Sequence, residues 1–279
     1  MSITVTRFAP SPTGLLHLGH AYAAKVARDL ARGSGGRFLL RFEDIDHTRV
    51  REDYFGAIEE DLRWLGLVWD ESPLRQSDRA GAYAAALETL KRREVVYPCF
   101  CTRREIEEEV AGMVSAPQGP EGPLYPGTCR RIPADEREHR ISRGEQPAWR
   151  IDAGKAAGIS PSLTFRDLRH GLQRVDPGLL GDVVLARKDI GTSYHLAVVV
   201  DDAFQRITHV TRGEDLLPST HVHRLLQSIL ELPEPAYLHH PLIADEAGVR
   251  LAKRNDALAI RTLRESGRDP ASLLAGFPS

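Results

Sequence analysis

The chain has 279 residues, of which 42% are hydrophobic and 27% are charged, as is usual for a soluble globular protein. The first seven residues lack the charged lead and apolar core of a signal peptide, and the longest aliphatic run, 196–200, is far too short to span a bilayer. We therefore expect a cytoplasmic protein without membrane contact. The formal net charge of −2 gives no support to a nucleic-acid partner, but it does not exclude one, because basic residues can cluster on a single face.

The chain begins with a predicted strand over 3–8, a loop, and a predicted helix over 21–31. The loop R-F-A-P-S-P-T-G (7–14) contains two prolines and a glycine, which force a rigid turn, and H-L-G-H (17–20) follows it. The helix therefore turns its unpaired N–H groups and positive dipole end toward the loop, which makes an anion site. The histidines at 17 and 20 share one face of the first helical turn, and the glycine at 19 leaves space for a flat group.

An isolated H-x-G-H could equally be two surface histidines. Together with the preceding R-F-A-P-S-P-T-G, however, it resembles the H-I-G-H signature of class I aminoacyl-tRNA synthetases, and within that class the glutamyl branch. The resemblance covers residues 3 to about 256. It implies an α/β fold, namely a Rossmann-type doubly wound parallel sheet with an inserted, zinc-containing subdomain like an acceptor-binding one, and a short C-terminal helical tail.

The same resemblance divides the chain into four parts. Residues 1–96 are expected to form the first half of the catalytic domain, 97–180 the inserted subdomain, 181–256 the second half with a KMSKS-like loop, and 257–279 a short helical segment.

Acidic residues follow the second predicted strand, 37–42. They form E-D-I-D (43–46) at the carboxyl end of the strand, where doubly wound sheets place their ligands. Taken alone, this pattern is also that of a solvated acidic turn. The longer R-F-E-D-I-D-x-T-R resembles R-I-E-D-T-D-x-x-R of glutamyl-tRNA synthetases, which implies that Glu43 holds the amino group of the substrate. A bound ammonium group needs such an anionic partner.

Helices are predicted over 52–65 and 77–93, and a short charged helix over 103–110 within a region rich in Pro and Gly. The region also contains all three cysteines, Cys99, Cys101 and Cys129. An odd number argues against a disulfide framework, and three thiols alone fall short of a closed tetrahedral zinc site. Some members of the family hold zinc here with a C-x-C pair, a tyrosine and a final cysteine, which implies Tyr125 as the fourth ligand. The alternative is that the thiols are small buried hydrophobes and the metal is lost.

Two further strands, 149–151 and 163–167, are predicted to belong to the insertion. Arginines of this region, among them Arg130, Arg131 and Arg150, either contact tRNA phosphates or form a solvated basic face.

The central sheet is expected to resume at 183–188 and to continue with a buried parallel strand in S-Y-H-L-A-V-V-V-D-D (193–202), because its aliphatic run is typical of such a strand. The segment resembles S-Y-H-F-A-x-V-V-D-D of the family, which implies that Tyr194 contacts the amino acid. The next strand and loop, 207–216, match I-T-H-V-x-R-G-x-D, which implies that Arg212 reads a substrate carboxylate.

A helix is predicted over 219–230, and R-L-A-K-R (250–254) then resembles the K-M-S-K-S loop, often K-L-S-K-R in this branch. Arg250 keeps the first positive charge and Lys253 the second, whereas Ala252 lacks the hydroxyl, which leaves its effect on the loop open. One helix (257–266) and a tail bounded by proline complete the chain. The anticodon-binding region of full-length glutamyl-tRNA synthetases is expected to be absent.

A glutamate site needs two cations and an anion, because the substrate has two carboxylates and one ammonium group. The predicted glutamate site is Arg7, Ser11, Glu43, Tyr194 and Arg212. The predicted ATP site is His17, Gly19, His20, Arg250 and Lys253, of which His17, His20 and Lys253 are the catalytic donors, with Mg²⁺ on the phosphates. Which arginine binds the side-chain carboxylate stays open.

A short chain with both motifs resembles the glutamyl-Q tRNA(Asp) synthetases. This resemblance implies that ATP activates L-glutamate to glutamyl-adenylate, and that the glutamate passes to the queuosine base in the anticodon stem-loop of tRNA(Asp), with the enzyme a monomer. Three alternatives remain: a glutamate-activating enzyme with a non-tRNA acceptor, a minimal synthetase acting on the 3′ end, and an inactive regulatory paralogue.

Overall fold

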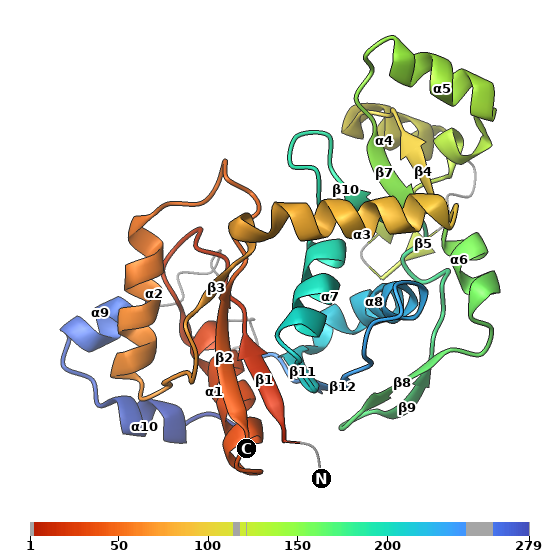
Figure 1. Cartoon of the computed structure of the whole chain (residues 1–279). Coiled ribbons are helices and arrows are strands. Elements are labelled where there is room, and N and C mark those ends of the chain that lie inside the picture. The colour runs from red at the N-terminus through yellow and green to blue at the C-terminus, as the bar shows by residue number, and fades with distance from the viewer. Residues whose placement is uncertain (1–2, 114–117, 121, 244–258, 279) are drawn as a thin grey trace.

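The computed structural model describes residues 3–113, 118–120, 122–243 and 259–278 (Figure 1). Its first half is built from β1 (Val5–Phe8), α1 (Leu18–Arg32), β2 (Arg37–Phe42) and α2 (Asp53–Trp64). β1 pairs with β2, and β2 with the short β3 (Leu74–Arg75), all parallel. The strands and helices predicted for this half are confirmed.

A second sheet has the order β11-β12-β8-β9. Its strands are β11 (His209–Gly213), β12 (Ala236–His240), β8 (Thr164–Asp167) and β9 (Gly171–Arg174), and only the β8–β9 pair is antiparallel. β11 lies beside β1, where the Thr208 N–H donates to the Val5 carbonyl oxygen across 3.0 Å. The parallel strands of both sheets therefore form one layer, and their carboxyl ends share an edge.

The two faces of this layer differ in chemistry because side chains alternate along a strand. On one face, Phe38, Leu40 and Phe42 of β2 pack against α1 and α2. On the other face, Val5 and Leu39 belong to a smaller apolar cluster, and the next inward-facing residues toward the edge are charged. Arg7, Arg41 and Arg212 are among these buried charged residues.

A third, antiparallel sheet has the order β10-β7-β4. Its strands are β4 (Val96–Cys99), β7 (Ala148–Ile151) and β10 (Val184–Ala186). Helices α4 (Arg103–Gly112) and α5 (Ala134–Ser142) accompany it at the upper right of Figure 1, and the long α3 (Ala80–Arg92) runs toward it from the first half. The smaller elements nearby are β5 (Gln118–Gly119), β6 (Gly122–Pro123), α6 (Ala153–Ile159) and the 3₁₀ turns η1 (Gln76–Arg79) and η2 (Thr128–Arg131).

Two strands join other sheets than the sequence predicted. β8, expected in the insertion, pairs with β12 of the parallel layer, and β10, expected in the central sheet, pairs with β7. Hydrophobic alternation predicts that a segment is a strand but carries no information about its partner. The four-part division of the chain stays a prediction.

The predicted strand over 193–202 is wrong, because the structure forms helix α7 (Tyr194–Phe204) there. Leu196, Val198 and Val199 are buried in the same cluster as residues of α3 and of α8 (Leu217–Ile229). A helix that is buried on several sides is apolar all round, so periodicity alone does not distinguish it from a buried strand.

Residues 259–278, the described C-terminal stretch, form two short helices instead of the one predicted, α9 (Ile260–Glu265) and α10 (Pro270–Ala275). α9 packs against α2, with Ile260 and Leu263 in the core of the first half. In the part of the chain that the structure describes, no helix is long and apolar enough to cross a membrane.

Candidate active site

Two cavities open at the carboxyl edge of the parallel layer. The first, of about 220 Å³, is lined by His17, Gly19 and His20 at the start of α1 and by Gly213 and His240, which end β11 and β12. The structure therefore brings the three described residues of the predicted ATP site to one cavity. They lie at a helix N-terminus, which favours anions.

The two histidines cap α1 with their ring nitrogens. His17 Nδ1 accepts from the Gly19 N–H across 3.2 Å, and His20 Nδ1 accepts from the His17 N–H across 3.3 Å. Because both Nδ1 atoms act as acceptors, the proton of each neutral ring is on Nε2. Each ring thus presents an N–H donor on the side away from the backbone it caps.

The second cavity, of about 420 Å³, is lined by Ser11, Glu43 and Tyr194, three residues of the predicted glutamate site. Burial raises the pKa of Glu43, and the charges of Arg41 and then Arg7 oppose this rise. Arg7 and Arg212 are not at the wall of this cavity, and both side chains are buried behind it.

Arg7 is paired with an acid of the protein itself. Its Nε donates to Asp202 Oδ1 across 2.8 Å, its Nη2 to Asp202 Oδ2 across 3.4 Å, and its Nη1 to the Thr211 carbonyl oxygen across 3.1 Å. Although burial opposes ionisation, Arg7 and Arg41 lower the pKa of Asp202, so the positive charge of Arg7 is already balanced.

Arg212 has only neutral partners within the described residues. Its Nη1 donates to Tyr194 Oη (3.3 Å) and to His223 Nδ1 (3.1 Å), and its Nε donates to His239 Nε2 (3.3 Å). Its Nη2 donates to the Thr220 hydroxyl oxygen. The guanidinium is therefore fixed in place while its charge is not neutralised by an ion pair.

The histidines around Arg212 are neutral at physiological pH. Burial first, and the charge of Arg212 second, lower the pKa of His239 to about 4 and that of His223 well below its usual range. His239 Nδ1 lies 2.6 Å from Asp167 Oδ2 and donates to it, which leaves Nε2 as the acceptor that Arg212 needs.

Arg250 and Lys253, predicted for the ATP site, lie outside the described residues. The described chain resumes beside the first cavity, where Ala259 forms an antiparallel bridge with His17 and the Ile260 N–H donates to the Leu16 carbonyl oxygen across 2.8 Å.

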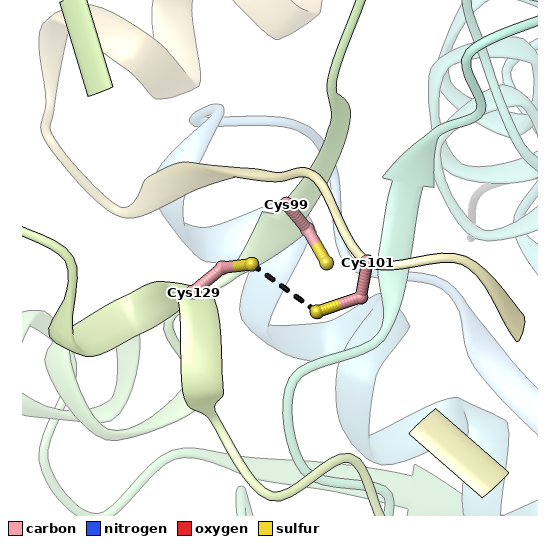
Figure 2. A group of neighbouring side chains, drawn as sticks. All are labelled: Cys99, Cys101 and Cys129. Carbon is pink, nitrogen blue, oxygen red and sulfur yellow. Dashed lines mark hydrogen bonds between the residues drawn. The ribbon is translucent and has the colours of Figure 1, made fainter. Parts of the chain in front are cut away.

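The three cysteines meet near the end of β4 (Figure 2). Their Sγ atoms all lie within 4.8 Å of one another, and the Sγ atoms of Cys101 and Cys129 are 3.3 Å apart. The hydroxyl oxygen of Tyr125 is 3.5 Å from Cys99 Sγ and 3.6 Å from Cys101 Sγ. All four predicted ligands are thus brought together, and the cysteines could hold a metal ion.

The chemistry of this group fits a metal that prefers thiolates. Hydrogen bonds from the Cys99 thiol, the Tyr125 hydroxyl and the Phe100 N–H lower the pKa of Cys129, against the effect of burial, and so favour its thiolate. The Arg150 guanidinium stacks 3.9 Å above the Tyr125 ring. Thiolate ligands are those that zinc prefers in structural sites.

The arginines of the third-sheet region are held by the protein. Arg130 pairs with Asp182 across 2.9 Å, Arg131 donates to the Pro126 carbonyl oxygen, and Arg150 donates to the Asp182 carbonyl oxygen. Their contact with tRNA phosphates stays a prediction.

Sequence reasoning missed the buried residues that hold Arg7 and Arg212. Asp202 binds Arg7 and also a third buried arginine, Arg41, and Thr220, His223 and His239 bind Arg212. The adjacent acids at the end of the aliphatic run, Asp201 and Asp202, are the one signal that could have pointed to them, since acids next to buried apolar residues need cations.

The comparisons with known proteins identify the family of the chain. A family model described as tRNA synthetases class I (E and Q), catalytic domain, matches residues 4–278. A glutamyl-Q tRNA(Asp) synthetase of Rhodobacter capsulatus is 49% identical over 275 residues, which are 96% of this chain and 98% of that protein. A protein of the same name from Symbiobacterium thermophilum is 44% identical over 278 residues, which are 96% of this chain and 83% of that protein.

Among solved structures, a glutamate tRNA ligase from Elizabethkingia meningosepticum in complex with its amino acid is similar, with a TM-score of 0.76 and 31% identity. The match covers 91% of this chain and 52% of that chain, so the protein spans about half of that ligase. The chain resembles the glutamyl-Q tRNA(Asp) synthetases over almost its whole length, and it belongs to the class I tRNA synthetases of the E and Q group, a family of ligases.

Proposed function

We propose that the protein activates L-glutamate with ATP to glutamyl-adenylate and transfers the glutamate to the queuosine base in the anticodon stem-loop of tRNA(Asp). The observation that carries the first step is Arg212, a buried guanidinium without an acidic partner among the described residues, whose Nη1 bonds to Tyr194 at the wall of the second cavity. A fixed planar cation whose charge no acid balances suits a carboxylate, which would accept from the Nη2 N–H that is not donated to Thr220.

The proposed glutamate site combines Arg212 with Glu43, Ser11 and Tyr194. Glu43 would accept from the α-ammonium group, and the hydroxyls of Ser11 and Tyr194 would complete the hydrogen bonds. Arg7 is the second cation of the site, although Asp202 already balances its charge. We therefore assign the binding of a substrate carboxylate to Arg212 in the first place.

The proposed ATP site is the first cavity, with His17, Gly19 and His20 and the predicted cations Arg250 and Lys253. The α-carboxylate of glutamate attacks the α-phosphorus in line, and pyrophosphate leaves. The Nε2–H groups of His17 and His20 would donate to the phosphate oxygens as negative charge develops there. Mg²⁺ bound to ATP would neutralise part of the phosphate charge.

A structural zinc ion held by Cys99, Cys101, Tyr125 and Cys129 belongs to the same proposal. It would fix the loop around η2 to the end of β4, next to the Gly- and Pro-rich segment that has little apolar surface of its own.

The acceptor is the step that the residues themselves do not name. Its support comes from the relatives, since two proteins at 49% and 44% identity are named glutamyl-Q tRNA(Asp) synthetase. The likeness to a glutamate tRNA ligase makes the 3′ end of a tRNA the second candidate.

Radiolabelled L-glutamate, ATP and tRNA from cells with or without queuosine test the proposal. Label that requires queuosine, on a base whose diol then resists periodate, is the expected result. Label that is independent of queuosine and located on the 3′ ribose would show a minimal glutamyl-tRNA synthetase instead. Formation of adenylate without label on any tRNA would point to another acceptor, and the absence of adenylate as well would favour an inactive paralogue.

A further inference from the structure

Arg41 is a buried cation to which neither the resemblance nor the proposed reaction assigns a task. It lies on β2, is 0% exposed, and its Nη1 donates to Asp202 Oδ1 across 2.8 Å and to Gln205 Oε1 across 3.0 Å. Its Nε and Nη2 are buried without a hydrogen-bond partner among the residues that the structure describes. Leaving two donors of a buried charge unsatisfied is costly, so a purely structural ion pair does not explain this placement.

The unsatisfied side of Arg41 faces Glu43. The Arg41 Nη2 atom lies 3.8 Å from Glu43 Oε1, close enough for an ion pair but too far for a hydrogen bond. The two residues are two positions apart where β2 ends, so strand geometry sends both side chains to the same face, opposite Phe42. Arg41 thus lies directly behind a carboxylate that lines the second cavity.

The charges around Arg41 balance only if Glu43 is ionised. Asp202 is shared between Arg7 and Arg41, so one acid faces two cations. The neighbouring Asp201 is not available, because Gln76, Arg79 and Tyr83 bind it. Glu43 is therefore the second acid of this buried group, and Arg41 is the strongest influence that opposes the rise of its pKa by burial.

We propose that Arg41 is a positioning residue that keeps Glu43 a carboxylate directed at the cavity, and that it thereby sets the requirement for an α-ammonium group in the substrate. This inference rests on the proposed function, in which Glu43 binds that ammonium group. Its specific consequence is selectivity for an α-amino acid over the dicarboxylic acid of the same length without the amino group.

The test compares L-glutamate with glutarate, which has both carboxylates but no ammonium group. Binding of each to the full-length protein is measured by calorimetry between pH 6 and 8.5, for wild type, R41M and R41K. The matched control is R79M, which removes a cation that is paired with Asp201 and not with Glu43. We expect R41M to weaken glutamate binding roughly 10- to 100-fold, the effect of one charged hydrogen bond, and glutarate binding less than threefold.

The pH profile separates positioning from a general structural defect. Without Arg41, Glu43 ionises at higher pH, so the glutamate affinity of R41M should recover in part as the pH rises, and R41K should lie between R41M and wild type. E43Q cannot ionise, so it should lose at least as much affinity as R41M without recovery at high pH, and the double variant should lose little more than E43Q. If R41M does not fold, R41K is used for the test. Its glutamate affinity should also fall, but by less than is expected for R41M.

An unchanged glutamate-to-glutarate ratio and pH profile in the folded Arg41 variants would overturn the inference while leaving the proposed function intact. A wild type that binds glutarate as well as glutamate would overturn both, because Glu43 would then not read the ammonium group.

Discussion

Arg7 and Asp202 form a buried ion pair, Nε to Oδ1 2.8 Å, although they are 195 positions apart in the chain. The pair links β1 to α7, and through Arg41 it also holds β2. It therefore ties the first half of the parallel layer to the helix that covers its charged face.

Removing the charge of Asp202 should destabilise the protein strongly. Asp202→Asn leaves two buried guanidinium groups without their acid, and breaking a buried pair in this way costs about 3–5 kcal/mol. We expect Tm to fall by about 10 °C in calorimetry or thermal scanning. Asp189→Asn, which removes an exposed partner of Arg187, is the control and should change stability by less than about 1 kcal/mol. A drop no larger than that of the control would contradict the assignment.

Replacing Arg212 by lysine should weaken the binding of glutamate. Arg212→Lys keeps the charge but loses the planar fork, so KM for glutamate in ATP–pyrophosphate exchange should rise roughly 10- to 100-fold. Arg224→Lys, on α8 beside Glu234 and outside the lining of both cavities, should leave KM unchanged. Equal KM values for the two variants would remove Arg212 from the glutamate site.

The sequence predicts the local structure of the first half well, because β1, α1 and β2 each have one apolar face and clear ends. It does not predict α7, since a helix buried on several sides and a buried strand have the same composition. The sequence also does not predict which strands β8 and β10 pair with, because strand pairing depends on contacts between residues that are far apart in the chain.

The sequence likewise predicts some residues of the candidate site and misses others. His17, His20, Glu43 and the cysteines were found because they stand in short motifs, and the structure brings each group together at a cavity or cluster. Asp202 ends the motif over 193–202, which implies a role only for Tyr194, and His223 and His239 stand in no such motif. Their importance comes from contacts with Arg7 and Arg212, which only the folded chain reveals.

His17 has two separable tasks, capping α1 with Nδ1 and donating with Nε2. Asparagine is a good N-cap residue, so His17→Asn should change Tm by no more than about 2 °C. It has no donor at the position of Nε2, so the rate of ATP–pyrophosphate exchange should fall roughly 100-fold or more. A variant that lost stability and activity together would show that the role of His17 is structural.

The cysteine cluster should bind about one zinc ion per chain, as measured by atomic absorption. Because a structural metal contributes its binding free energy to folding, a strong chelator should lower Tm, and Cys101→Ala should abolish the metal and the chelator effect together. Tyr125→Phe keeps three thiolates, so it should bind zinc more weakly but still detectably. Retention of the full metal content by Cys101→Ala would refute this set of ligands.

Asp61, at the contact between α2 and α9, should make the stability of the protein fall as the pH rises. Its side chain is 0% exposed, and within the described part of the chain neither carboxylate oxygen accepts a hydrogen bond. Arg264 Nη2 lies 3.7 Å from Asp61 Oδ1, while Arg264 Nη1 binds Glu60. Burial raises the pKa of Asp61 to about 6, with Arg264 and Arg261 opposing. Between the unfolded pKa of about 4 and this value the folded state holds the extra proton, so the contribution of Asp61 to stability is present at low pH and is lost as the pH rises.

Replacing Asp61 by asparagine removes this titration. At pH 7.5, Asp61→Asn should therefore raise the free energy of unfolding by about 1–3 kcal/mol, and Tm by a few degrees, whereas at pH 4 the variant and wild type should be alike. Glu60→Gln, one position away and exposed, should change stability little at either pH. If Asp61→Asn were less stable than wild type at pH 7.5, Asp61 would be a favourable partner of Arg264, and the contact between α2 and α9 would depend on an ion pair instead of on a protonated acid.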